Sequence, residues 1–86
     1  MREAYKIILT PEENGSYTVF APDFDSGTQG ENFADAIYMA RDLIGIMGNT
    51  LQKMGKDIPV PGSAVYSPEE NEIVTFVDLN FEASLN

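Results

Sequence analysis

One long amphipathic stripe in the middle of the chain constrains the fold more than any other feature of the sequence. Its apolar residues recur in alternating steps of four and three, which places them on one side of an α-helix. They are Phe33, Ile37, Ala40, Ile44, Met47, Leu51 and Met54. Asn32 is a good N-cap, and Asp35 can reach back to it as in a capping box. Gly55 suits the position after the last turn. The sequence therefore predicts one long helix that starts after Asn32, ends before Gly55 and buries one side.

The residues before this helix alternate between apolar and polar types as β-strands do. A first strand is expected over residues 3–10, with its odd-numbered apolar side chains on one face and Ile8 on the other. Residues 11–15, Pro-Glu-Glu-Asn-Gly, predict a hairpin loop, because Pro cannot donate to a ladder and Asn-Gly readily adopts positive φ. A second strand is expected over residues 16–21 and a short third strand over residues 28–31.

The residues after the helix predict a crossing segment and a last strand. Two prolines in residues 58–63 exclude a helix there and discourage a central strand, so this segment should cross the domain in extended form. Residues 72–79 are apolar on both faces, which is typical of a strand with neighbours on both sides. We therefore expect one α+β domain over residues 1–86, in the order β-β-β-α-β, with a mostly antiparallel sheet and one helix on one face.

One helix covers one face of such a sheet, which leaves apolar side chains on the other face. They are Ile8, Phe20, Val74 and Phe76. Burying groups of this size is worth roughly 1.5–3 kcal/mol each, so leaving the set in water is costly. Either a partner surface or a second copy covers them, or residues 58–65 fold across them. Because a chain of 86 residues has only a small core, we expect a homodimer or a higher oligomer.

The composition removes most catalytic and cofactor chemistry. The chain has no Cys and no His, which excludes disulfides, zinc-thiolate and imidazole metal sites, and histidine-based nucleophilic catalysis. Carboxylates remain, and Asp23, Asp25 and Asp78 could together bind a divalent metal for phosphoryl hydrolysis. A chain with 14 acidic residues produces such a trio by chance, and loop aspartates usually bind turn backbone. The sequence therefore favours a non-enzymatic chain without a cofactor, with a metal-dependent nuclease as an alternative.

The net charge of −9 comes from 14 acidic and 5 basic residues. Five dispersed cations cannot neutralise the phosphates of a nucleic-acid site, so we expect no direct nucleic-acid binding. An acidic surface suits a basic protein partner, because opposite fields speed encounter, although acidity also simply keeps small proteins in solution. No apolar run approaches the roughly 18 residues of a membrane span, and no signal peptide is recognisable, so we expect no membrane association and a cytoplasmic location.

Four acids on the loops and at the helix start are the candidate contacts for a basic partner: Asp23, Asp25, Glu31 and Asp35. Their alternative role is to satisfy turn backbone and the helix cap. The four apolar residues left on the second sheet face are the remaining candidates. No catalytic, cofactor or metal residue is predicted.

Two stretches of the chain resemble the HicB antitoxin family. Residues 15–24 form a glycine-started strand that ends in Pro-Asp, and residues 27–36 follow with a glycine, a Thr-x-Gly step and an amphipathic helix with an early alanine. The Ile-Pro-Val-Pro of residues 58–61 and an apolar strand ending near residues 77–79 also fit. The resemblance covers roughly residues 5–81.

This resemblance implies a partial RNase H-like fold without nuclease activity. It also implies a protein that binds and neutralises HicA, a small basic toxin that cleaves RNA. Many family members carry a C-terminal DNA-binding domain, and we expect none within residues 1–86. The alternative function is therefore a stand-alone, non-catalytic interaction or regulatory domain. No binding residue follows from the resemblance.

Overall fold

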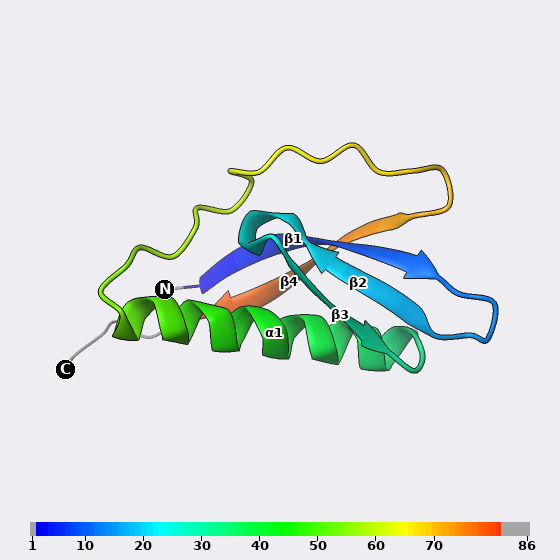
Figure 1. Cartoon of the computed structure of the whole chain (residues 1–86), viewed down its shortest axis with the longest axis horizontal. Helices are drawn as coiled ribbons and strands as arrows, with labels where there is room; N and C mark the ends of the chain where they lie inside the picture. Colours follow the sequence, from blue (N-terminus) through cyan, green and yellow to red (C-terminus); the bar gives the residue numbers. More distant parts are fainter. Residues whose placement is uncertain (1, 82–86) are drawn as a thin grey trace.

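The computed structural model describes residues 2–81 and shows one sheet with a helix on one of its faces (Figure 1). The elements are β1 (Arg2–Pro11), β2 (Tyr17–Ala21), the 3-10 turn η1 (Pro22–Phe24), β3 (Ser26–Gly30), α1 (Phe33–Lys53) and β4 (Ile73–Asn80). The strands are antiparallel and lie in the order β3-β2-β1-β4. The predicted α+β class and the order β-β-β-α-β are confirmed. Within residues 2–81, no helix is both long enough and apolar enough to cross a membrane.

The last strand lies at an edge of the sheet, so the prediction that it is central is wrong. The centre is taken by β1, in which Ile8 is opposite Phe20 of β2 on one side and opposite Val74 of β4 on the other. Nevertheless, β4 carries apolar side chains on both faces: Val77 is in the core beneath the helix, and Val74 and Phe76 lie on the outer face. A two-sided apolar pattern therefore reports which faces carry apolar groups, and says nothing about how many strands are paired.

Both ends of α1 are closed as the sequence predicts. The Asn32 side chain accepts the backbone N–H of Asp35 at 2.8 Å. The Asp35 carboxylate accepts the N–H of Glu31 at 2.9 Å, one residue earlier than a capping box would place it. At the other end, Gly55 has a φ of +73° and the chain closes with the paired hydrogen bonds of a Schellman motif. The helix direction is thus fixed at both ends, which positions its buried stripe on the sheet.

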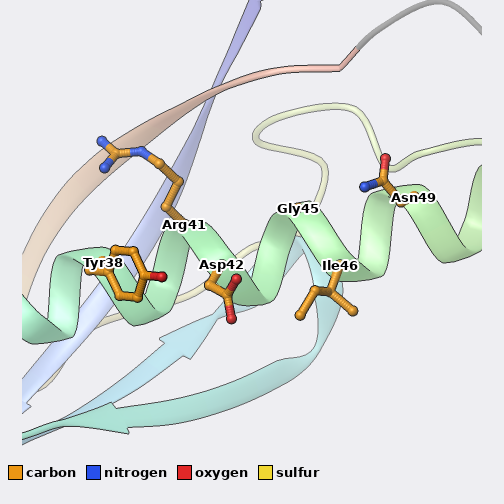
Figure 2. Close-up of a pocket in the computed structure, with 6 residues that line it drawn as sticks. All are labelled: Tyr38, Arg41, Asp42, Gly45, Ile46 and Asn49. Atoms are coloured by element: carbon orange, nitrogen blue, oxygen red, sulfur yellow. The ribbon is translucent and has the colours of Figure 1, made fainter.

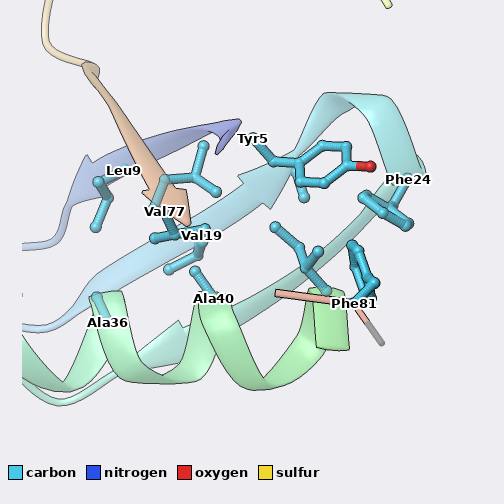
Figure 3. Close-up of a cluster of buried hydrophobic side chains, with 11 residues drawn as sticks. Tyr5, Leu9, Val19, Phe24, Ala36, Ala40, Val77 and Phe81 are labelled. Carbon is cyan, nitrogen blue, oxygen red and sulfur yellow. The ribbon is translucent and has the colours of Figure 1, made fainter. Parts of the chain in front are cut away.

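The core lies between the sheet and α1 (Figure 3). The Tyr5 ring meets Phe24 and Phe81 edge-on, with centroids 5.0 and 6.2 Å away. A Cβ atom at Gly48 would lie 2.4 Å from Cε1 of Phe81, so this helix glycine makes room for an aromatic side chain. At Gly45 the nearest atom is Cδ1 of Leu79, at 3.6 Å. The Phe81 side chain, and not another backbone, therefore accounts for Gly48, whereas the space around Gly45 would also accept an alanine.

The segment between α1 and β4 runs over the sheet face opposite the helix (Figure 1). Of the two alternatives for this face, coverage by the aliphatic side chains of residues 58–65 is not what the structure shows. Val65 is 96% exposed, and Ile58 packs against the core on the helix side. Tyr66 covers part of the face instead, with its ring centroid 5.6 Å from that of Phe20. One half of the outer face is therefore covered from within the chain.

Candidate functional site

Two of the three aspartates of the nuclease hypothesis are bound by other groups of the chain. The Asp23 carboxylate accepts two backbone N–H groups of the crossing segment, both at 2.9 Å. Asp78 is paired with Arg2 at 2.6 Å and with Arg41 at 3.3 Å. Asp25 lies exposed after η1. Among residues 2–81, no group of three or more His, Cys, Asp or Glu side chains could hold a metal ion. The described residues thus give the nuclease alternative no site.

The first candidate surface is the β3 edge, which we define as β3 with the four acids predicted as partner contacts. Asp23 and Asp25 lie where η1 leads into β3, and Glu31 and Asp35 lie where β3 leads into α1. A strand of this length spans about 17 Å. The structure therefore places the four acids in two pairs, one at each end of a short edge strand.

The four acids differ in how far their own chain occupies them. The Asp23 carboxylate accepts backbone N–H groups of the crossing segment, and the Asp35 carboxylate accepts a backbone N–H just before the helix. Both acids therefore bind backbone groups, which is the alternative role given in the sequence analysis. Asp25 and Glu31 are exposed, and their side chains make no hydrogen bond to another described residue. Asp25 has a φ of +48°, in the left-handed region that Asp tolerates better than most residues. Asp25 and Glu31 are therefore the two acids most open to a partner.

A groove of about 570 Å³ adjoins the end of β3 and the start of α1. It is lined by Asn14, Ser16, Thr28, Gln29, Gly30, Glu31, Asp35 and Met39. The strand and the helix touch closely here, because a Cβ atom at Gly30 would lie 2.4 Å from the Cα atom of Ala36. The lining is mostly polar and includes two carboxylates, which gives the groove the chemistry to hold a basic or amide side chain.

The second candidate surface is the β4 edge, which we define as the open side of β4 with Val74 and Phe76. These two side chains are 41% and 59% exposed. The other two residues predicted for this face lie in register with Val74 but are less exposed. Phe20 is half-buried beside Tyr66. Ile8 is 1% exposed and is not part of the cluster beneath the helix, so it is buried on the outer face and offers a partner no surface.

Basic side chains gather around the β4 edge. Arg2 and Arg41 bind the Asp78 carboxylate, and Nε of Arg41 also donates to the Asp78 carbonyl at 3.3 Å. The pKa of Asp78 is lowered, first by its own backbone N–H and then by Arg2. Lys6 is opposite Phe76 in the sheet register. Three of the five basic residues of the chain therefore lie along this one edge.

The exposed side of α1 carries a groove of about 340 Å³ (Figure 2). Its lining residues are Tyr38, Arg41, Asp42, Gly45, Ile46 and Asn49. Gly45 leaves a gap between larger side chains, and Arg41 points away from the groove towards β4 (Figure 2). The sequence analysis missed Tyr38 and Ile46 as exposed apolar groups. The available signal was that both are large and lie outside the buried stripe of the helix.

The fold is shared with two solved structures, an antitoxin domain and a toxin-antitoxin complex. No family model and no curated protein matches the chain. The N-terminal domain of the Burkholderia pseudomallei antitoxin HicB has a TM-score of 0.78 at 25% identity, over 92% of this chain and 100% of that one. A toxin-antitoxin complex from Streptococcus pneumoniae has a TM-score of 0.76 at 20% identity, over 93% of this chain and 70% of that one. The resemblance predicted from the sequence is confirmed: the chain is HicB-like in its fold.

Proposed function

We propose that the chain is an antitoxin that binds a small, basic, RNA-cleaving toxin of the HicA type and neutralises it without catalysis of its own. The observation that carries this proposal is the fold shared with the N-terminal domain of antitoxin HicB, at a TM-score of 0.78. Antitoxin-like neighbours favour a non-enzymatic role. The arrangement is then the partial RNase H-like fold that the family resemblance implies, and the cytoplasm is the expected location.

The β3 edge is the surface that we assign to the toxin. Asp25 and Glu31 are exposed acids at its two ends, and the polar groove lies beside Glu31. A basic toxin approaching a chain of net charge −9 is steered by long-range attraction, which raises the association rate. Salt screens this attraction over about 8 Å at 0.15 M. We therefore expect the association rate to fall as salt rises, while the dissociation rate changes much less.

Stopped-flow binding to the product of the adjacent reading frame tests this assignment. The variant Asp25→Asn/Glu31→Gln removes two negative charges from the β3 edge, and Asp42→Asn/Asp57→Asn removes two exposed charges elsewhere. At low salt, the first pair should slow association about threefold to tenfold, and the control pair should have a smaller effect, because steering acts mainly near the contact. Equal slowing by both pairs would contradict the β3 assignment while leaving toxin binding intact.

An RNA cleavage assay tests the function itself. The toxin should lose its activity when the chain is present in excess, and the chain alone should cleave no RNA. Absence of binding, or undiminished cleavage, would overturn the antitoxin proposal and leave a non-catalytic interaction domain. Specific DNA binding is not expected, because a mobility shift that survives about 0.15 M salt needs more phosphate contacts than five dispersed cations supply.

We also infer that copies of the chain associate as a homodimer or a higher oligomer. Val74 and Phe76 are exposed neighbours on one strand, and such a pair gains from removal from water. The domain is small, so association would add to a limited core. Sedimentation at micromolar concentration that showed only a 9.5 kDa species would contradict this inference.

A further inference from the structure

We propose that two copies of the chain pair through the open edges of their β4 strands, in antiparallel orientation about a two-fold axis, so that their sheets become one. This inference rests on the self-association proposed above and specifies its surface and its geometry. It goes beyond toxin neutralisation, which we assign to the opposite edge of the sheet. In the pair, each β4 gains a second neighbouring strand on the side that β1 leaves open.

The open side of β4 is a long strand edge that carries charged side chains around Asp78 and, among the described residues, is unpaired over Val74 and Phe76. The strand has eight residues, contains neither Pro nor Gly, and has only β1 as a neighbour within residues 2–81. Exposed edges of this kind pair readily with other strands, and proteins usually protect them with prolines, bulges, charges or a covering element. The opposite edge differs, because β3 has five residues, two of them glycines, and is packed on the start of α1. Of the two edges, β4 is the one built to accept another strand.

The hydrogen bond between Arg41 and Asp78 indicates which backbone groups face outwards. The Asp78 carbonyl accepts from Nε of Arg41, a side chain of α1, at 3.3 Å, so this carbonyl points away from β1. The N–H of the same residue points to the same side of the strand. Backbone groups alternate in direction along a strand of an antiparallel pair, so the N–H and C=O groups of Val74 and Phe76 point to the same open side. They are the groups that a second strand can bind.

The exposed side chains favour a second copy as the occupant. Val74 and Phe76 both lie on the face away from α1 and are exposed. In an antiparallel pair related by a two-fold axis, Val74 of one copy can lie beside Phe76 of the other on one continuous face. An aromatic residue beside a β-branched residue is a stabilising cross-strand pair. The surface therefore complements itself in both hydrogen bonding and packing.

The charges along β4 also complement each other in this orientation. Arg2 and Arg41 surround the single carboxylate of Asp78 near the C-terminal end of the strand. Residues 69–72, which precede β4, carry three glutamates. Antiparallel pairing brings the basic end of one strand to the acidic end of the other, so the net charge of −9 per chain opposes association less here than elsewhere.

Two substitutions at the β4 edge and one matched control test the proposal. Val74→Pro removes an outward N–H, which an edge strand tolerates without losing its ladder to β1. Phe76→Lys places a charge on the paired face, and Val65→Lys makes the same change at a side chain that is 96% exposed. We expect the wild type and Val65→Lys to sediment at twice the 9.5 kDa chain mass. Both β4 variants should weaken the dimer at least about tenfold, the ratio expected when a central cross-strand contact is lost.

Circular dichroism establishes that each variant is folded, and if Val74→Pro does not fold, Phe76→Lys carries the test alone. In the wild type, hydrogen exchange at the amides of Val74 and Phe76 should slow as protein concentration rises. A dimer that persists in both variants, or whose amides at these positions exchange independently of concentration, would overturn the β4 pairing and leave self-association through another face. A monomeric wild type would overturn both, and toxin binding by the monomer would still be measurable.

Discussion

The two edges of the sheet differ in length, chemistry and charge. The β3 edge is short, contains two glycines, is packed on the helix, and has exposed acids at both ends. The β4 edge is longer, apolar and open, and three of the five basic residues lie beside it. An overall charge of −9 conceals this division. The comparison teaches that one small sheet can offer a charge-steered contact at one edge and a main-chain contact at the other.

The tight packing behind the β3 edge predicts the largest effect. At Gly30 an added Cβ atom would lie 2.4 Å from the Cα atom of Ala36, and a backbone atom cannot move aside as a flexible side chain can. We expect Gly30→Ala to lower the free energy of unfolding by about 3 kcal/mol, at the upper end of overpacking costs. Urea denaturation measures this loss.

A glycine on the β4 side provides the matched control. At Gly45 an added Cβ atom would make ordinary contact with Leu79, at 3.6 Å. Gly45→Ala should therefore raise the free energy of unfolding by up to about 1 kcal/mol through helix propensity. If Gly30→Ala were as stable as the wild type, β3 would not be packed tightly on the helix. The β3 edge and the β4 edge would then not differ in how firmly they are held.

The two acids at the start of β3 predict a smaller effect. Asp23 accepts two backbone N–H groups, and an Asn at this position has only one acceptor oxygen. Because water can reach the released amide, we expect Asp23→Asn to cost about 1 kcal/mol of stability. Asp25→Asn should cost less than about 0.5 kcal/mol, since Asn also tolerates positive φ and no bond is lost.

Thermal unfolding and amide exchange at Gly62 and Ala64 separate the two aspartates, because only Asp23→Asn should speed exchange at these positions. The rate of association with the toxin should rank the two variants in the opposite order, because we expect Asp25→Asn to slow association more than Asp23→Asn does. If instead Asp23→Asn slowed association with the toxin without changing the free energy of unfolding, Asp23 would contact the partner and would not stabilise the crossing segment.

Local features of the fold could be predicted from the sequence because they depend on neighbouring residues. Asn32, Asp35 and Gly55 lie within a few residues of the backbone groups that they satisfy, and the structure confirms them as helix ends. The alternation in β1 likewise predicts which of its side chains enter the core. The hairpin loop before β2 is confirmed too, with Gly15 at a φ of +90°.

Features that depend on distant residues were not predictable in this way. The edge position of β4 follows from its pairing with β1 alone, and the sequence of β4 does not indicate how many neighbours the strand has. Tyr66, and not the aliphatic residues before it, covers Phe20, because Asp23 and Glu72 anchor the crossing segment on either side of it. The acids at the β3 edge could be predicted as candidates from charge alone. Which of them stay unoccupied depends on contacts with residues about 40 positions away.

The smallest effect concerns the basic end of the β4 edge. The pKa of Asp78 is lowered in the folded chain, first by its own N–H and then by Arg2. Because the folded value lies below the unfolded value of about 3.9, the contribution of Asp78 to stability is complete above that pH. It is lost as pH falls through the lowered value. Protonation then weakens the contacts of the Asp78 carboxylate with Arg2 and Arg41.

An NMR titration of the Asp78 carboxyl carbon in single variants measures this coupling. Arg2→Gln should move the pKa of Asp78 back towards its ordinary value, but only in part, since the larger cause is the backbone N–H. Lys56→Gln removes the same charge beyond the end of α1 and is the control. An equal rise of the Asp78 pKa in both variants would assign the effect to net charge and not to the ion pair. A rise confined to Arg2→Gln would show that this end of β4 is held by a local, exposed contact, which salt and acid can release without unfolding the sheet.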